Sequence, residues 1–237
     1  MLILAVDTST RMGSAAILRN SEVLAEVSGY EETPYSSRIF RDVALLQDRA
    51  ACTLDQIDLF AVASGPGSFT GLRVGLTAVK AWAEIYRKPI AAVSGLEAIA
   101  VEALADGASE ETWIAPFLDA RRGQLFGAIY GRQAGESGSL SLQTDESILS
   151  IEEFLEMLKG RSGEHVHLAS STPDALPASR LAEAMPAARV IPVSAALAST
   201  IGRLGRERAN RGEVVDAMRL DANYVRRSDA ESKWTDR

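Results

Sequence analysis

LILAVDTSTRMGSAAILRN, residues 2–20, and WIAPFLDARRGQLFGAIYGR, residues 113–132, follow one pattern. In each stretch an apolar segment typical of a buried strand ends in an aspartate, Asp7 in the first and Asp119 in the second. A short polar turn that contains a glycine follows, and a second apolar strand completes the hairpin. Because the pattern returns in the second half of the chain, it indicates a duplicated unit.

The segments around each hairpin continue as alternating strands and helices. In the first half we expect strands at 2–6, 14–18, 22–28, 59–63 and 90–93, and helices at 36–50, 68–86 and 96–104. Beyond the strand pair at 113–132, we expect a strand at 139–143, a helix at 151–158, a strand at 166–169 and a helix at 195–210. These segments predict an α/β fold of two βββαβα units. That order resembles the two-lobed actin-like and sugar-kinase superfamily, here with an N-terminal lobe at 1–108 and a C-terminal lobe at 109–237.

The composition is that of an ordinary globular protein. Of 237 residues, 46% are hydrophobic and 24% are charged. The formal net charge of −7 argues against binding nucleic acid alone, because neutralising phosphates needs clustered lysine and arginine. Cys52 is the only cysteine, so no internal disulfide is expected, and a cytoplasmic location is favoured. We expect neither a signal peptide nor a membrane span, since no apolar run is long enough.

The glycine-rich stretch SGPGSFTGLRVG, residues 64–75, lies between a predicted strand and a predicted helix. Backbone N–H groups bind anions in that context. However, no lysine follows Gly71, as a Walker loop requires, and the three glycines are one residue too widely spaced for a dinucleotide fingerprint. As a phosphate-binding motif the stretch is weak.

The turn after the first strand is a second candidate phosphate site, because this turn binds phosphate in the actin-like superfamily. Asp7 could hold a hydrated magnesium ion, and the turn could offer hydroxyl and N–H groups to a phosphate from Thr8, Ser9, Gly13 and Ser14. The alternative is that these residues satisfy a tight hairpin. The corresponding stretch of the second half, 167–177, has no glycine for an adenine site. We therefore expect weak binding of ATP and magnesium at most, and no required cofactor.

No catalytic or metal-binding set is visible in the sequence. His165 and His167 would share one face of a strand, but a zinc site needs further ligands, and two histidines on a half-exposed strand are more often without metal. Cys52 lies at the alanine-rich end of a helix, where a buried structural thiol is the simpler interpretation. We expect neither a metal site nor a catalytic residue.

Several motifs together resemble the bacterial TsaB family, also called YeaZ, which takes part in making threonylcarbamoyladenosine on transfer RNA. The motifs are LAVDTST at 4–10, GSAAIL at 13–18, SGPGSFTGLRVG at 64–75, LDARRGQLF at 118–126 and NYVRR at 223–227. Two positions depart from the family pattern: Ala222, where relatives often have proline, and YSSRIF at 35–40, where many have a histidine.

The resemblance implies a partner. TsaB is similar to its catalytic paralogue TsaD, which holds a metal with a His-x-x-x-His pair that this chain lacks on its first helix. The chain is then expected to be a non-catalytic subunit that, together with TsaE, holds TsaD in its active arrangement. TsaD would transfer the threonylcarbamoyl group, and this chain would contact transfer RNA only as part of the complex. Without its partner the chain could form a homodimer.

The helix predicted at 68–86 offers a surface for this partner. Its small and apolar residues form a broad arc, wider than one-sided burial requires, and two glycines in a helix are better explained by close packing than by chance. The family is implied to pair through its first two helices. The expected interface comprises Ser68, Gly71, Leu72, Gly75, Ala78, Val79 and Trp82, with Ile39 and Val43 from the first helix. The alternative is that the helix is buried within its own lobe.

Two other functions stay open at this stage. A metalloendopeptidase would need metal ligands that the sequence does not show. A stand-alone ATP-dependent small-molecule kinase would need an adenine loop and a catalytic base.

Overall fold

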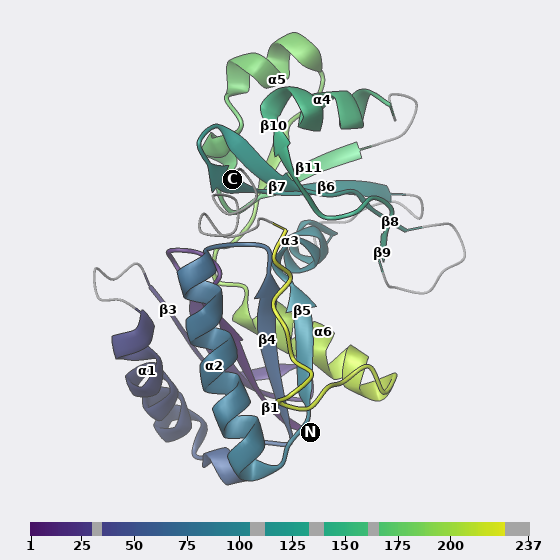
Figure 1. Cartoon of the computed structure of the whole chain (residues 1–237). Helices are drawn as coiled ribbons and strands as arrows, with labels where there is room; N and C mark the ends of the chain where they lie inside the picture. Colours follow the sequence, from purple (N-terminus) through teal and green to yellow (C-terminus); the bar gives the residue numbers. More distant parts are fainter. Residues whose placement is uncertain (30–34, 105–111, 133–139, 161–165, 226–237) are drawn as a thin grey trace, which may run out of the picture. The chain divides into compact units, whose positions relative to one another are not determined.

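The computed structural model describes residues 1–29, 35–104, 112–132, 140–160 and 166–225 (Figure 1). The chain divides into two compact units, which are described separately. The first contains Met1–Ala98 together with Ala195–Tyr224, and the second contains Ile99–Ser194.

The first unit is built on a five-stranded sheet in the order β3-β2-β1-β4-β5. Its strands are β1 (Leu2–Asp7), β2 (Ser14–Arg19), β3 (Glu22–Ser28), β4 (Leu59–Gly65) and β5 (Ile90–Ser94). The first three form an antiparallel meander, whereas β4 and β5 continue from β1 in parallel. β1 and β4 are buried almost throughout, which explains why both read as continuous apolar runs.

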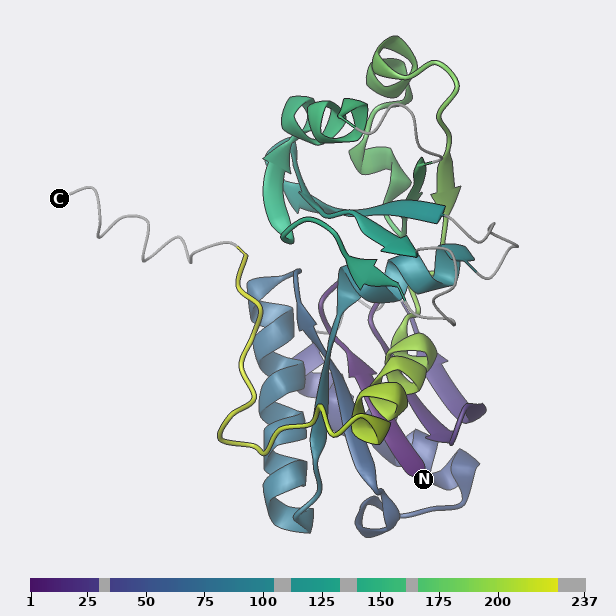
Figure 2. The same ribbon diagram turned by 90° about the vertical axis from the view of Figure 1, so that its right-hand side faces the viewer.

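Helices cover both faces of this sheet. α1 (Tyr35–Ala50) and α2 (Phe69–Tyr86) lie on one face, and α6 (Ala198–Asn210) lies on the other (Figures 1 and 2). A short 3-10 turn, Leu54–Gln56, precedes β4, and α3 (Gly95–Leu104) follows β5. In the part of the chain that is described, no helix has both the length and the apolarity of a membrane span.

The position of α6 corrects the expected lobe boundary. The sequence places this helix in a C-terminal lobe that runs from 109 to 237, but α6 packs on β1, β2, β4 and β5 of the first unit. Its glycines allow the close approach: a Cβ added to Gly202 would lie 2.5 Å from a methyl group of Leu18, and one added to Gly205 would lie 2.7 Å from the Cβ of Ala61. The second face of the sheet is apolar and needs a cover, and the helix that supplies it comes from the far end of the chain.

The second unit repeats the topology of the first. Its main sheet has the order β10-β7-β6-β11-β12, with β8 and β9 added beside β6. The strands are β6 (Thr112–Arg121), β7 (Gln124–Gly127), β8 (Tyr130–Arg132), β9 (Ser141–Leu142), β10 (Ser147–Ser150), β11 (Val166–Ser170) and β12 (Val190–Pro192). The helices are α4 (Ile151–Lys159), the 3-10 turn Pro173–Ala175 and α5 (Ala178–Ala184).

This repeat confirms the duplicated α/β fold, with one correction. β6, β7 and β10 form the antiparallel part and β11 runs parallel to β6, as β4 does to β1. The third strand is therefore Ser147–Ser150, not the predicted 139–143, of which residues 141–142 pair with β8 instead. The two stretches are both short and polar at their edges, so strand propensity does not separate them.

A C-terminal strap, residues 211–224, returns along the first unit after α6 (Figure 2). Val215 exchanges two backbone hydrogen bonds of 2.9 Å with Ile90 on the edge strand β5. Leu220 is buried in the core of the unit, and the amide of Asn223 donates to the carbonyl oxygen of Ser64 at 2.7 Å. The strap closes the open edge of the sheet and ends beside the glycine-rich loop.

Candidate functional site

Asp7 lies at the end of β1, in the turn predicted to bind phosphate, and its side chain is fully buried. One carboxylate oxygen, Oδ1, accepts hydrogen bonds from the amide of Ser9 at 2.8 Å and from its hydroxyl at 2.6 Å. The other oxygen, Oδ2, is buried without a hydrogen-bond partner. Burial raises the pKa of Asp7, and the two bonds from Ser9 oppose this only in part. The ionised form that magnesium binding needs is thus disfavoured.

The other residues of the predicted phosphate set meet in this turn, but their polar groups are engaged within the chain. The hydroxyl of Thr8 donates to the carbonyl oxygen of Gly71 at 2.7 Å. The carbonyl oxygen of Ser9 accepts from the amide of Ser68 at 2.7 Å, and the hydroxyl of Ser14 accepts from the amide of Ala198 at 3.0 Å. These bonds tie the turn to the starts of α2 and α6, as the structural alternative requires.

Tyr35, the first residue of α1, covers the glycine of the turn. Gly13 has a φ of +46°, and a Cβ added there would lie 1.6 Å from the hydroxyl oxygen of Tyr35. The hydroxyl group donates to the carbonyl oxygen of Thr10 at 3.1 Å, a bond that it shares with Arg11 at 3.3 Å. Burial raises the pKa of Tyr35 to about 12, so the hydroxyl remains a donor at neutral pH. A ligand that approached Gly13 from this side would have to displace the tyrosine.

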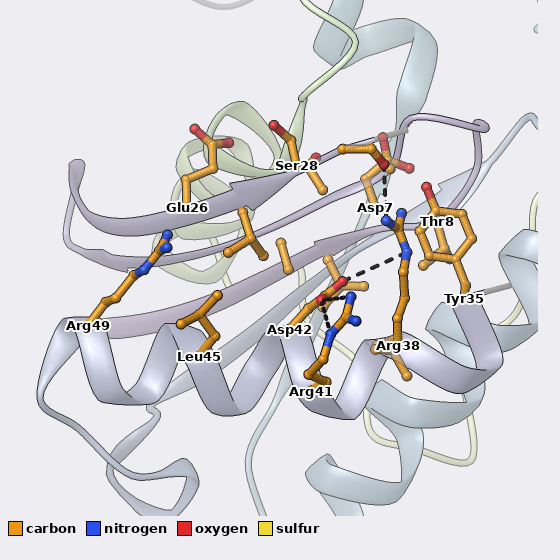
Figure 3. Close-up of a pocket in the computed structure, with 17 residues that line it drawn as sticks. Asp7, Thr8, Glu26, Ser28, Tyr35, Arg38, Arg41, Asp42, Leu45 and Arg49 are labelled. Carbon is orange, nitrogen blue, oxygen red and sulfur yellow. Dashed lines mark hydrogen bonds and ion pairs between the residues drawn. The ribbon is translucent and has the colours of Figure 1, made fainter. Parts of the chain in front are cut away.

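A cavity of about 460 Å³ lies between α1 and the strands β2 and β3 (Figure 3). Its wall carries three arginines and three acids, namely Arg38, Arg41, Arg49, Asp7, Glu26 and Asp42. Of these six residues, Arg38 is the one that the helical pattern could have identified, because it is next to Ile39 on the buried side of α1. Our sequence reasoning missed it.

The glycines of α2 face their own lobe, which corrects the predicted interface. A Cβ added to Gly71 would lie 2.0 Å from the carbonyl oxygen of Thr8, and one added to Gly75 would lie 2.3 Å from its hydroxyl oxygen. Five other predicted contact residues fill the core of the unit: Ile39, Val43, Leu72, Ala78 and Val79. The turn after β1 and the core occupy the space around these seven residues, as the alternative of a helix buried within its own lobe requires.

The start of α2 is capped by Ser68, whose side chain accepts a hydrogen bond from the amide of Gly71 at 3.2 Å. Next to it, the ring of Tyr224 lies 5.0 Å from that of Phe69, and Arg73 lies over the Phe69 ring and donates to the tyrosine hydroxyl. Tyr224 of the NYVRR motif therefore attaches the strap to the start of α2, next to the glycine-rich loop. Residues 226–227 lie outside the described residues.

On α1 and α2, the exposed apolar side chains of Phe40 and Ile85 accompany Trp82, which is 6% exposed and belongs to the lobe core. We call these three residues the α1–α2 patch. Phe40 is 62% exposed and Ile85 is 70% exposed. The Phe40 ring meets Trp82 edge to face at 6.0 Å, and Trp82 in turn stacks on Phe60 inside the lobe. Ile85 follows Trp82 by one helical turn. Trp82 belongs to the predicted interface, whereas our sequence reasoning did not include Phe40 or Ile85.

The histidine pair can be followed only in part, because His165 lies outside the described residues. His167 is on β11 and is exposed. Within the described ranges, no three histidine, cysteine, aspartate or glutamate side chains gather as a metal site would require. The absence of a metal stays a prediction.

Comparisons with known proteins agree with this architecture. The family model described as "TsaD: tRNA N6-adenosine threonylcarbamoyltransferase" matches residues 33–199. "tRNA threonylcarbamoyladenosine biosynthesis protein TsaB" of Bacillus subtilis is 32% identical, over 99% of this chain and 98% of the relative. The protein of the same name from Escherichia coli is 32% identical over 70% of each chain.

Among solved structures, "YeaZ from Pseudomonas aeruginosa" superposes with a TM-score of 0.70 at 26% identity, over 94% of this chain and 99% of that one. The similarity to the Bacillus subtilis relative runs over nearly the whole of both chains. The chain therefore belongs to the TsaB (YeaZ) family of tRNA threonylcarbamoyladenosine biosynthesis proteins, within the wider family that the TsaD model describes.

Proposed function

We propose that this chain acts in the biosynthesis of threonylcarbamoyladenosine as a non-catalytic subunit that binds and activates TsaD. The names of its relatives and the match to the TsaD family model support a role in this modification. The observation that carries the partner role is the α1–α2 patch. Phe40 and Ile85 are large apolar side chains that stay 62% and 70% exposed beside a filled core, and aromatic residues are enriched in protein interfaces.

The turn after β1 supports the non-catalytic part of the proposal. Its hydroxyl groups hold α2 and α6, Tyr35 covers Gly13, and burial raises the pKa of Asp7. A magnesium ligand or a general base acts in its ionised form, which burial disfavours at Asp7. We therefore propose that the chain needs neither ATP nor a metal for its own part, and that it meets transfer RNA only through TsaD.

The binding experiment uses the full chain with purified TsaD. Phe40→Ala and Ile85→Asp should each weaken the complex at least about tenfold, since truncating an interface anchor or placing a charge there costs about 2 kcal/mol or more. Leu142→Asp is the matched control, because Leu142 is 49% exposed but lies in the second unit. Wild-type affinity in both patch variants would exclude this surface.

The α1–α2 patch also determines how copies of the chain and TsaD are expected to assemble. Because the patch is apolar and self-complementary contacts are common between copies, a homodimer through it is expected when TsaD is absent, and TsaD should compete with it. TsaE would join the TsaB–TsaD pair. Sedimentation of the chain with and without TsaD tests the competition, and Ile85→Asp should abolish the homodimer.

Two enzymatic alternatives are not favoured, and one preparation separates them from the subunit. Highly purified chain should show no magnesium-dependent turnover of ATP and no stoichiometric zinc or iron after dialysis. ATP turnover abolished by Asp7→Ala would support the kinase, and metal lost from a His165→Ala, His167→Ala variant would support the metalloendopeptidase.

A further inference from the structure

The N-terminal half of α1 rests on polar contacts more than on packing. Ile39, Val43 and Leu46 join α1 to the lobe core, and of these three only Ile39 lies in the N-terminal half of the helix. The side that faces β3, however, lines the cavity of about 460 Å³, where close-packed atoms are absent (Figure 3). α1 also contacts β2 and β3, but the cavity beside it reduces the close packing that holds its first turns, so directional interactions matter more for their position.

Arg38 supplies such an interaction. Its residue is 4% exposed, and its guanidinium group donates to the carbonyl oxygen of Gly29 at 3.0 Å and to that of Met12 at 3.2 Å. The two acceptors belong to different segments, the end of β3 and the β1–β2 turn. Asp42, one helical turn further along α1, lies 3.8 Å from Nε. Because the guanidinium fork is planar and rigid, bonds to two separate carbonyls define where this part of α1 sits.

Tyr35 adds a third bond at the same place. The guanidinium carbon of Arg38 lies 4.3 Å from the centre of the tyrosine ring, and the tyrosine hydroxyl donates to Thr10. The β1–β2 turn thus receives bonds from two residues in the first turns of α1. Arg38 and Tyr35 together attach the start of α1 to the β1–β2 turn.

We propose that Arg38, supported by Tyr35, is a positioning residue for partner binding: it sets the orientation of α1 and so places Phe40 against Trp82. This inference rests on the proposed function. Phe40 follows Arg38 by two residues and is 62% exposed, so the edge-to-face contact with Trp82 does little to hold it. A small rotation of the first turns of α1 would move the phenylalanine out of the α1–α2 patch.

The test is a double-mutant cycle read as affinity for TsaD. Arg38→Met should weaken binding at least about tenfold, and in a Phe40→Ala background the same change should have less than about twofold effect, since the group it positions is gone. Arg38→Lys, which keeps the charge and donors but loses the fork, should be intermediate. Arg49→Met, an exposed arginine on the same helix, is the control and should bind like the wild type.

The outcomes separate the two claims. If the wild-type chain does not bind TsaD, the proposed function fails and this inference with it. If Phe40→Ala weakens binding but Arg38→Met does not, or if the two effects simply add, Arg38 does not act through Phe40 and only the inference is overturned. Should Arg38→Met fail to fold by circular dichroism, Tyr35→Phe carries the same cycle. That change removes one oxygen and should weaken binding a few-fold, again only when Phe40 is present.

Discussion

At the scale of single residues, burial and hydrogen bonding act on Asp7 in opposite directions. The bonds from Ser9 stabilise the charged carboxylate, whereas the loss of water disfavours it, and burial has the larger effect. The residue that the sequence suggests as a magnesium ligand is thus one whose charged form burial disfavours. The same turn illustrates why residue types alone do not define a phosphate site: the hydroxyls of Thr8 and Ser14 are bonded to α2 and α6, and that of Ser9 is bonded to Asp7.

The first prediction concerns Asp7→Asn. The unfolded chain releases this proton near the ordinary pKa of 3.8, but the folded chain keeps it to a higher pH. Between these two values the folded state binds more protons than the unfolded state, so the wild type loses stability as the pH rises, and the asparagine variant does not. Asp7→Asn should be the more stable protein at about pH 7, and the two should converge toward about pH 4. Urea unfolding across this range measures the difference, and a less stable variant at neutral pH would show that the Ser9 bonds dominate.

The second prediction concerns Gly71→Ala. In an open helix this change stabilises by about 1 kcal/mol. Here the added Cβ would lie 2.0 Å from a backbone oxygen of Thr8, and overpacking of this kind costs about 1–3 kcal/mol. The variant should therefore melt several degrees lower than the wild type. Thr77→Ala, at an exposed position of the same helix, is the control and should melt no lower. An unchanged melting temperature for Gly71→Ala would mean that the turn can move away.

At the scale of elements, the last part of the chain completes the first lobe. α6 covers the sheet face opposite α1 and α2, and the strap pairs with β5 and ends against α2. The glycine-rich loop is therefore held from three sides: by its own helix cap, by the turn after β1, and by the strap. Its glycines are explained by close approach to Thr8, Ser9 and Asn223, and no bound phosphate needs to be invoked.

The third prediction tests the strap through two neighbouring apolar residues. Leu220 is 2% exposed and belongs to the lobe core, whereas Met218 is 91% exposed. Leu220→Ala should lower the free energy of unfolding by about 2–5 kcal/mol, as cavity-creating changes do. Met218→Ala should leave it unchanged within about 0.5 kcal/mol. Equal effects of the two changes would mean that the strap is detached in solution.

At the scale of the whole molecule, the first folding unit is discontinuous in the chain. Residues 1–98 supply the sheet and the helices of one face, and residues 195–224 supply α6 and the strap. A sheet with one bare apolar face cannot bury enough surface to offset its loss of conformational entropy.

The fourth prediction follows from this division. A fragment of residues 1–108, the lobe as the sequence delimits it, should not unfold cooperatively on heating. Residues 1–98 joined through a flexible linker to 195–224 should do so, as a single transition followed by circular dichroism. A cooperative transition in the shorter fragment would show that α6 is dispensable to the lobe.

The sequence was sufficient for what depends on local pattern. The paired hairpins at 2–20 and 113–132 predicted the duplicated unit, and the glycine-rich stretch predicted the start of α2, where Ser68 caps the helix. Family membership followed from the same motifs. The sequence could not show which segment covers the buried face of each helix. A helical pattern indicates that one face is buried, but not which segment covers it. For this reason the sequence alone assigns α6 to the C-terminal lobe and predicts that Gly71 and Gly75 contact a partner protein.

Only the tertiary structure could decide these points, because they depend on contacts between segments far apart in the chain. Thr8 meets Gly71, α6 meets the first sheet, and Arg38 reaches the carbonyl oxygens of Met12 and Gly29. Backbone carbonyls are present at every residue, so no sequence pattern marks the two that accept from Arg38. Burial itself is likewise a property of the assembled lobe, and burial is what raises the pKa of Asp7, the residue that the sequence suggests as a magnesium ligand.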